Sequence, residues 1–176
     1  MAATGRILIV DDEASLRHSL TRILQTAGHD VTTAQSGREA LDYLGQQPFD
    51  LVFLDIRMPD MNGLETLKII HRKFPLVSVV LFTAQPDLNS AIQAMREGAI
   101  DYLLKPLKPQ VILDRAQSLL AQMQIERRKR EIQSQIQSLR AELRSLENPE
   151  VVPSDSTAKE MAAGERFLIR GKLKFD

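Results

Sequence analysis

Four side chains that can bind a metal ion or a phosphate stand at the ends of short apolar runs. They are Asp11 and Asp12 after residues 6–10, Asp55 after residues 49–54, and Lys105 after residues 99–104. If these runs are parallel neighbouring strands, their carboxyl ends meet at one edge of a sheet. Carboxylates gathered there repel one another unless a cation joins them. The arrangement therefore indicates a magnesium-dependent site that accepts a phosphoryl group.

These residue types suit the transfer of a phosphoryl group to a carboxylate. Mg2+ takes hard oxygen ligands in octahedral geometry, which two or three carboxylates and a carbonyl supply. Asp55 is the candidate nucleophile, and Lys105 with the metal would neutralise charge on the transferred group. Thr83 ends the fourth apolar run and is placed to donate its hydroxyl to the attached group. The added charge of roughly 1.5 to 2 would draw Thr83 and its loop inward.

Each of these residues taken alone has a more ordinary explanation. An Asp-Asp pair is common at strand ends and helix N-caps, and a Lys-Pro pair is nearly uninformative. Thr83 alone is typical of a cap or turn, and Tyr102 alone is typical of a half-buried core position. The specific signal is the combination, in this order, at the ends of successive strands.

The composition is that of an ordinary globular protein. Of the 176 residues, 43% are hydrophobic and 26% are charged, and the formal net charge is zero. These values indicate no general attraction to nucleic acid or to membranes. The lack of cysteine excludes disulfides, zinc thiolate sites and cysteine nucleophiles. The N-terminus shows no signal peptide and the apolar runs are too short to span a bilayer, so we expect a cytoplasmic protein.

Apolar runs alternate with amphipathic segments over most of the chain. Five of the runs have the length of strands, at residues 6–10, 30–34, 51–54, 78–82 and 101–104. Helical spacing of apolar residues separates them, and Ser36 with Glu39 forms a capping box at one helix start. This alternation predicts an α/β fold with a parallel sheet. A strand order of 2-1-3-4-5 would bring Asp12, Asp55 and Lys105 together, although alternation alone does not fix that order.

A long helical pattern follows, from about Pro109 to Leu146. Within it, apolar residues recur in steps of four and three, which is the spacing of a coiled-coil seam. They are Ile132, Ile136, Leu139, Leu143 and Leu146, and the seam extends back less cleanly through Lys129 to Ile125. We expect this helix to form a parallel dimeric coiled coil. The basic cluster at residues 127–130 has opposite charges four residues away, which favours a solvated helix face over a nucleic-acid site.

Four motifs resemble the receiver domain of two-component response regulators, over residues 5–122. They are Ile7–Glu13, Leu54–Gly63, Leu81–Ala84 and Gly98–Pro106. The resemblance implies a flavodoxin-like fold with strand order 2-1-3-4-5, and phosphorylation of Asp55 by a sensor histidine kinase. It also implies Mg2+ bound by Asp12, Asp55 and the backbone carbonyl of Arg57, with Asp11 acting partly through water.

The same resemblance assigns a switching role to residues around the acceptor. Thr83 and Tyr102 form a switch pair, and Lys105-Pro106 is a cis peptide that aims the lysine. We therefore expect a switch whose only chemistry is its own phosphorylation and dephosphorylation, rather than an enzyme. A magnesium phosphatase with Asp55 as covalent intermediate shares this chemistry, but the sequence shows no sign of a substrate cap.

Two further residues are expected to set the lifetime of the phosphorylated form. Arg57 and Gln85 stand two residues beyond Asp55 and Thr83. By resemblance, such positions adjust how water reaches the phosphoryl group. Arg57 is a bulky cation at this place, so we expect slow intrinsic dephosphorylation.

The predicted organisation has four parts. They are a receiver domain at residues 5–122, a coiled-coil helical extension at 123–147, a linker at 148–165, and a strand or hairpin at 166–176. The last segment is too short to bury its apolar side chains unaided, so we expect it to begin an output domain that the chain cuts short. It faintly resembles the first strand of winged-helix DNA-binding domains, which suggests a transcriptional output. The alternatives are a protein-interaction switch and an enzymatic output domain.

The expected partners follow from this organisation. They are a cognate sensor histidine kinase, a second copy of the chain bound through the long helix, and DNA only if an output domain follows. Transcriptional receivers of the winged-helix group dimerise through charged pairs, for which Asp101 and Arg115 are candidates. The neighbouring positions are uncharged here, namely Ala91, Ile100, Val111 and Ser118. That departure favours the long helix as the dimer contact.

Overall fold

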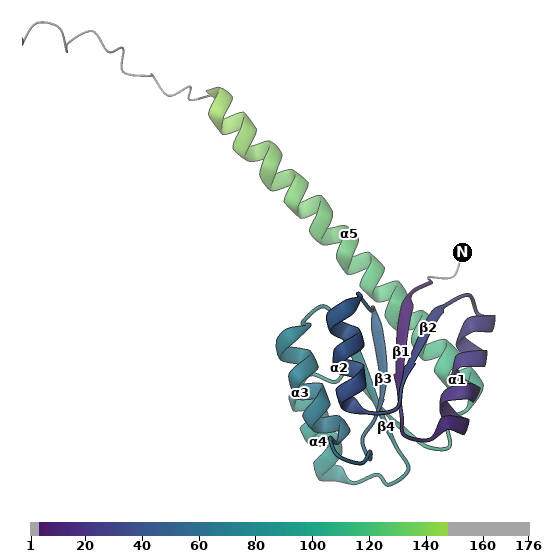
Figure 1. Ribbon diagram of the computed structural model, residues 1–176. Helices are drawn as coiled ribbons and strands as arrows, with labels where there is room; N and C mark the ends of the chain where they lie inside the picture. Colours follow the sequence, from purple (N-terminus) through teal and green to yellow (C-terminus); the bar gives the residue numbers. More distant parts are fainter. Residues whose placement is uncertain (1–3, 148–176) are drawn as a thin grey trace, which may run out of the picture. The chain divides into compact units, whose positions relative to one another are not determined.

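Five parallel strands form one sheet in the order β2-β1-β3-β4-β5 in the computed structural model, which describes residues 4–147 (Figure 1). The strands are β1 (Arg6–Val10), β2 (Asp30–Ala34), β3 (Leu51–Asp55), β4 (Ser78–Thr83) and β5 (Asp101–Leu104). The predicted α/β class and strand order are therefore confirmed. The order changes direction between β1 and β3, and this is the place where open parallel sheets bind ligands at their carboxyl ends.

Five helices connect and follow the strands. They are α1 (Ala14–Thr26), α2 (Gly37–Gln46), α3 (Gly63–Lys73), α4 (Leu88–Arg96) and α5 (Pro109–Glu147). Helices α2, α3 and α4 bury apolar side chains against one face of the sheet, while α1 and the first turns of α5 cover the other face (Figure 1). The sheet is thus enclosed on both sides, as parallel sheets generally are.

Alternation along the strands divides the core into two clusters. In β1, Leu8 and Val10 face α2, α3 and α4, whereas Ile7 and Ile9 face α1 and α5. Strands β3 and β4 divide their residues in the same way, and all of their residues are buried. Burial on both faces explains why these strands are continuously apolar in the sequence. Edge strand β2 is more polar and more exposed.

Local signals place the helix ends close to where the sequence predicts them. The Ser36 hydroxyl caps α2 by accepting a hydrogen bond from the Glu39 amide at 3.2 Å. The Glu39 carboxylate in turn accepts a hydrogen bond at 2.8 Å from the amide of Gln35, one residue before the cap. Gly28 follows α1 with φ 90°, a conformation that glycine adopts without strain.

Helix α5 is 39 residues long and changes character along its length. Its early residues Ile112, Ala116, Leu119 and Leu120 are buried against the sheet. The predicted seam residues, by contrast, are exposed, from 42% for Ile132 to 73% for Leu146. The predicted linker at 148–165 and the strand or hairpin at 166–176 lie outside the described residues. Within residues 4–147, the helices are not long and apolar enough to cross a membrane.

Candidate functional site

The carboxyl ends of β1, β3 and β5 bring the four predicted side chains together. One carboxylate oxygen from each of Asp11, Asp12 and Asp55 lies within 4.8 Å of the others. The Lys105 Nζ donates to Asp11 Oδ2 at 2.7 Å and to Asp55 Oδ2 at 3.1 Å. It also lies 5.2 Å from the centre of the Phe82 ring. The structure therefore joins residues that are up to 94 positions apart in the chain.

The three carboxylates differ in exposure and in the bonds they already make. Asp11 is fully buried, and its Oδ1 accepts from the Glu13 amide at 2.7 Å while its Oδ2 binds Lys105. Asp55 is 3% exposed, and its Oδ1 is buried without a hydrogen-bond partner among the described residues. Asp12 is exposed. The oxygens left for a ligand are thus those of Asp12 and Asp55 Oδ1.

Burial and charge shift the pKa values of the central pair in ways that fit a cation site. Burial raises the pKa of Asp55, and the nearby Asp11 raises it too, while the hydrogen bond from Lys105 opposes the shift. Burial alone would lower the pKa of Lys105, but its bonds to Asp11 and Asp55 outweigh burial and raise it. One lysine therefore does not fully offset two buried carboxylates. A second cation would relieve the remaining repulsion.

Gly63, the first residue of α3, packs directly on the backbone of the acceptor. A Cβ at this position would lie 2.1 Å from the Asp55 carbonyl oxygen and 2.8 Å from the Ile56 Cα. The Gly63 amide also donates to the Ile56 carbonyl at 2.9 Å. The missing side chain lets the start of α3 close against the end of β3, and this contact holds the Asp55 backbone in place.

A protein-family model described as the response regulator receiver domain matches residues 7–117. The chain belongs to the response regulator receiver family. The matched span ends within α5 and contains the acidic cluster of Asp11, Asp12 and Asp55 together with Lys105.

Relatives of this receiver domain are transcriptional regulators. The alginate biosynthesis transcriptional regulatory protein AlgB of Pseudomonas aeruginosa strain PAO1 is 35% identical over 175 residues, which is 96% of this chain and 37% of that protein. The DNA-binding transcriptional regulator NtrC of Klebsiella pneumoniae is 46% identical over 102 residues, 58% of this chain and 22% of that protein. The chain thus spans well under half the length of these curated relatives.

Solved structures show the same fold. A CheY-like response regulator receiver domain protein from Methanospirillum hungatei JF-1 has a TM-score of 0.67 and 31% identity, covering 69% of this chain and 97% of that one. NtrX from Brucella abortus has a TM-score of 0.69 and 30% identity, covering 74% of this chain and 30% of that one. The first match spans almost a complete receiver domain.

The switch candidate Thr83 lies at the end of β4, next to the acceptor strand of the receiver domain. It is 1% exposed, and its Oγ1 accepts from the Gln85 amide at 3.2 Å. The Thr83 carbonyl accepts from the Lys105 amide at 2.8 Å. The Lys105-Pro106 bond is cis, as the resemblance implies. Thr83 is therefore connected by its backbone to the site lysine and by its side chain to the loop before α4.

The other two predicted positions lie at the border of the receiver site. Tyr102 packs against the core face covered by α2, α3 and α4, and its hydroxyl is buried without a hydrogen-bond partner within residues 4–147. Burial raises the pKa of this phenol, the backbone of Asp87 opposes the shift, and the negative charge of Asp87 adds to it. The Arg57 side chain is exposed, and its backbone amide favours the ionised form of Asp55. The proposed use of the Arg57 carbonyl as a ligand stays a prediction.

Two supporting residues escaped the sequence analysis. Arg17 in α1 donates to the Asp11 carbonyl at 2.6 Å and so fixes the backbone of the acidic pair. Gly63 entered the sequence analysis only as the last residue of the Leu54–Gly63 motif, whereas its packing role depends on contact with β3. The Asn-Gly pair at 62–63 was the available signal for a close approach. No sequence pattern predicts that Arg17 donates to a backbone oxygen.

The candidate dimer pair Asp101 and Arg115 meets within one chain. The Arg115 Nε lies 2.5 Å from the Asp101 Oδ2, joining β5 to α5. The role of this pair between subunits stays a prediction.

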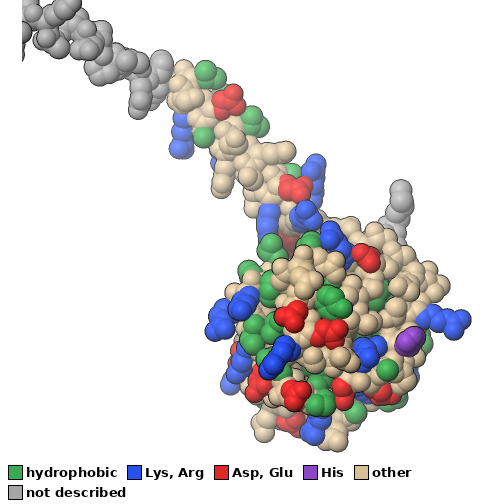
Figure 2. Space-filling model, in the orientation of Figure 1, with side chains coloured by type: hydrophobic (Ala, Val, Ile, Leu, Met, Phe, Trp, Pro, Cys, Tyr) green, Lys and Arg blue, Asp and Glu red, His purple; other side chains and the backbone are tan. Residues whose placement is uncertain are grey.

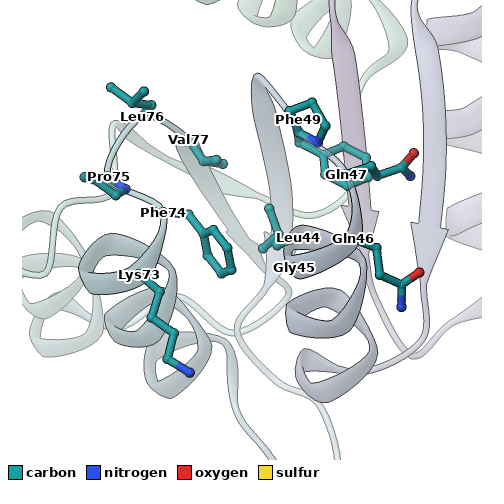
Figure 3. Close-up of a pocket in the computed structure, with 11 residues that line it drawn as sticks. Leu44, Gly45, Gln46, Gln47, Phe49, Lys73, Phe74, Pro75, Leu76 and Val77 are labelled. Atoms are coloured by element: carbon teal, nitrogen blue, oxygen red, sulfur yellow. The ribbon is translucent and has the colours of Figure 1, made fainter.

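A separate pocket of about 480 Å³ lies at the other end of α2 and α3 (Figure 3). Apolar side chains such as Leu44, Phe49 and Phe74 line it, and Lys73 is its charged residue. It has no carboxylate, hydroxyl or imidazole with which to bind a metal or form a covalent intermediate. We therefore assign the chemistry of this domain to the acidic cluster and not to this pocket.

With no cation bound, replacing Asp55 with asparagine is expected to increase the free energy of unfolding at pH 7. The pKa of Asp55 is raised in the folded state, so the fold loses stability as pH rises above the ordinary value of this carboxyl. Asparagine removes that loss at pH 7. Urea denaturation in EDTA measures the free energy of unfolding of the variant and of the wild type. Saturating Mg2+ should make the wild type the more stable of the two, because only the wild type binds the ion. A less stable variant in EDTA would contradict the assigned cost of burying the charged carboxylate.

Proposed function

We propose that Asp55 accepts a phosphoryl group from a cognate sensor histidine kinase, and that the chain is the input switch of a two-component system. The observation that carries the proposal is Lys105 Nζ bonded to both Asp11 and Asp55 beside a third carboxylate, Asp12. This arrangement suits phosphoryl transfer, because a nucleophilic carboxylate oxygen lies beside a cation that can neutralise the charge of the transferred group. The family match supports the same role.

The residues present fit a magnesium ion. Asp12 and Asp55 would hold it together with the Arg57 carbonyl, with Asp11 acting partly through water, because Asp11 already uses both oxygens within the chain. The buried, unpartnered Asp55 Oδ1 is an oxygen that a hard cation would satisfy. When bound, the ion would neutralise negative charge on the transferred group and on the carboxylates.

The transfer step needs little of the protein beyond position and charge. An oxygen of the Asp55 carboxylate forms a bond to phosphorus as the bond from phosphorus to the kinase histidine nitrogen breaks, and that nitrogen keeps the electron pair. Lys105 stays within reach of the new acyl phosphate and offsets its charge. Since transfer to and from the same carboxylate requires no second substrate site, the domain acts as a switch and not as a turnover enzyme.

The proposed switch starts from the hydrogen bonds that Thr83 makes now. Its hydroxyl is engaged with the Gln85 backbone. A phosphoryl group on Asp55 offers stronger, charged acceptor oxygens. We expect Thr83 to exchange Gln85 for the phosphoryl group, which pulls on the loop before α4, and Tyr102 to move with that loop. The change would pass to the α4 and α5 side of the domain.

Incubation with acetyl phosphate and Mg2+ tests the acceptor. We expect the mass of one phosphoryl group to be added to Asp55 and to be lost in hydroxylamine, with no addition in the Asp55→Asn variant. Chelation of Mg2+ should prevent labelling of the wild type. Label on another residue would overturn the assignment. Continuous release of phosphate without a labelled intermediate would favour the phosphatase alternative.

Replacing Arg57 with alanine is expected to shorten the lifetime of the acyl phosphate several-fold. The exposed Arg57 side chain lies two residues beyond the acceptor, where its bulk and charge would restrict the approach of water. Decay of phosphorylated protein at constant Mg2+ measures the lifetime. The same measurement on Arg38→Ala, another exposed arginine, is the control. An unchanged lifetime in Arg57→Ala would count against the role.

The output proposed for the chain is transcriptional, and it would act through α5. The exposed seam is the surface through which we propose that two copies pair, while DNA would be bound only by an output domain beyond the receiver. The names of AlgB and NtrC support transcription. A protein-interaction switch or an enzymatic output remains the alternative. The location we propose is the cytoplasm, where a kinase and DNA are both accessible.

A further inference from the structure

Every polar atom of Asp11 already has a hydrogen-bond partner in the receiver domain. Its amide donates to the Ala34 carbonyl at 3.2 Å, and its Oδ1 accepts from the Glu13 amide at 2.7 Å. Its Oδ2 accepts from Lys105 Nζ at 2.7 Å, and its carbonyl oxygen accepts from Arg17 Nη1 at 2.6 Å. Asp11 is also fully buried. These four hydrogen bonds fix Asp11 so firmly that it can act as a support for the residue that follows it.

Asp12 differs from Asp11 because its side chain is exposed. It lies between the end of β1 and the start of α1 and belongs to neither element. One of its carboxylate oxygens nevertheless lies within 4.8 Å of oxygens from Asp11 and Asp55. Burial does not hold this exposed side chain in place, so its direction depends on the backbone that carries it.

Arg17 holds the peptide group that joins Asp11 to Asp12. The Asp11 carbonyl oxygen, which accepts from Arg17 Nη1, and the Asp12 amide belong to one planar unit. Holding that oxygen therefore fixes the plane from which the Asp12 side chain projects. A hydrogen bond from a guanidinium is charge-assisted and hence stronger than one between neutral groups. On the other side of Asp12, the Glu13 amide is held by Asp11 Oδ1, so the backbone is fixed both before and after Asp12.

The Arg17 side chain projects from a well-anchored part of α1. The Arg17 amide donates to the Glu13 carbonyl at 3.1 Å in the first turn of this helix. The helix buries Leu20 and Leu24 in the core cluster that covers one face of the sheet, and the Arg17 side chain is half-buried. The guanidinium is thus carried by an element that packs on the sheet bearing the acidic cluster, and it can hold the exposed loop at residues 11–13 from outside.

We propose that Arg17 is a positioning residue for magnesium binding. By holding the Asp11 carbonyl, it directs Asp12 toward Asp55, so that these two carboxylates can bind one ion. This role rests on the acceptor and magnesium sites proposed above. Charge alone predicts the opposite effect, because a cation beside the cluster repels Mg2+. Loss of the Arg17 guanidinium therefore weakens magnesium binding if Arg17 positions Asp12, and strengthens it if only the charge of Arg17 matters.

A second arginine of α1 provides a matched control for the effect of charge. Basic and acidic side chains are intermingled on the face of the receiver domain that is visible in Figure 2, so the loss of one surface cation is expected to change the potential at the site little. Arg22 lies in α1 and is exposed. Arg17→Met and Arg22→Met remove the same charge and keep a similar apolar stem, but only the first removes the hydrogen bond to the Asp11 carbonyl.

Isothermal titration of the full chain with MgCl2 tests the role without any phosphorylation. We expect Arg17→Met to bind Mg2+ about tenfold more weakly than the wild type, as is typical when a group that orients a metal ligand is lost. Arg22→Met should bind as the wild type does. Circular dichroism confirms folding at the temperature used. If Arg17→Met does not fold, Arg17→Lys takes its place, with a smaller weakening expected because lysine keeps the charge and a single flexible donor group. Unchanged or tighter binding would overturn the proposal.

A double-mutant cycle shows whether Arg17 acts through Asp12. Asp12→Ala removes the carboxylate that Arg17 is proposed to orient, and by itself it should weaken magnesium binding. In the Asp12→Ala background, Arg17→Met should change the dissociation constant for Mg2+ by less than twofold, because no side chain is left to position. A full tenfold effect in that background would show that Arg17 acts on another part of the site and would overturn the proposal.

Labelling by acetyl phosphate at increasing Mg2+ separates positioning from a role in the transfer step. We expect the Mg2+ concentration at half-maximal labelling to rise about tenfold in Arg17→Met, while the rate at saturating Mg2+ stays within twofold of the wild type. A lower saturating rate at an unchanged midpoint would overturn the proposal. A wild type that binds Mg2+ but never gains a phosphoryl group on Asp55 would instead overturn the proposed function, and the titration results for Arg17 would still stand.

Discussion

Replacing Gly63 with alanine is expected to destabilise the receiver domain by about 3 kcal/mol. The new methyl group would lie 2.1 Å from the Asp55 carbonyl oxygen and 2.9 Å from the Asp55 carbonyl carbon. Both are backbone atoms of a strand paired on both sides, so they have little freedom to move away. Relief requires that α3 shift outward or that the end of β3 tilt, and either change displaces the acceptor.

Gly45 provides the matched control. It lies in α2, and a Cβ there would meet nothing within 4 Å. Gly45→Ala should therefore stabilise the helix by roughly 0.5 to 1 kcal/mol, because alanine restricts the unfolded chain and favours helix. Urea denaturation of both variants should show that the free energy of unfolding falls in Gly63→Ala and rises in Gly45→Ala. Equal small effects would show that α3 is free to adjust.

Function should respond to Gly63→Ala more than stability alone requires. Gly63 has no side chain to take part in chemistry, but it fixes the backbone that carries Asp55. We expect the rate of labelling by acetyl phosphate to fall at least tenfold at a temperature where the variant is still folded. Circular dichroism at that temperature confirms folding. A folded variant with normal labelling would show that the contact serves stability only.

The fold was largely predictable because its signals are local. Buried strands β3 and β4 are continuously apolar, and the caps at Ser36 and Gly28 are determined by a few neighbouring residues. The strand order is not local. It came from the resemblance, since alternation permits several orders and only long-range packing selects one.

The acidic cluster was predictable for a related reason. Residues at the carboxyl ends of parallel strands must share one edge, so identifying the strands was enough to bring Asp11, Asp55 and Lys105 together. Which carboxylate oxygens remain free to bind a ligand was not predictable. This depends on the hydrogen bonds that the oxygens already make, such as that from the Glu13 amide to Asp11 Oδ1. Such bonds are properties of loop geometry and not of residue type.

The exposed part of α5 shows the opposite limit. A seam of apolar residues at a and d spacing predicts that this helix pairs with another helix. The resemblance covers residues 5–122 and therefore does not identify the partner of the residues that follow.

Replacing Lys105 with methionine is expected to have the largest effect on both stability and chemistry. Methionine keeps the length and apolar stem but removes the ammonium that bonds Asp11 at 2.7 Å and Asp55 at 3.1 Å. Two buried carboxylates would remain without their cation. Breaking a buried charge pair in this way typically costs about 3 to 5 kcal/mol. We expect a loss near the lower value in EDTA at pH 7, because the carboxylates retain some access to water through exposed Asp12.

The pH and magnesium dependence of this loss identify its cause. Burial already raises the pKa of Asp55, and removal of Lys105 raises it further. Protonation then relieves the repulsion, so the difference between variant and wild type should be full near pH 7 and shrink as pH falls toward the ordinary pKa of 3.8. Saturating Mg2+ should restore part of the stability, because it supplies the missing positive charge. Lys68→Met, which removes a half-exposed pair with Glu97, should change stability by less than about 0.5 kcal/mol at every pH.

Chemistry should not recover with stability. In the Lys105→Met variant held folded by Mg2+, the cation that offsets the charge of the acyl phosphate is still absent. We expect labelling of Asp55 by acetyl phosphate to fall by about a hundredfold, comparable to the loss of one strong electrostatic contact in a transition state. Magnesium affinity should stay equal or rise, since a competing cation has been removed. Loss of magnesium binding together with labelling would instead show that Lys105 shapes the metal site, and normal labelling would remove it from the transfer step altogether.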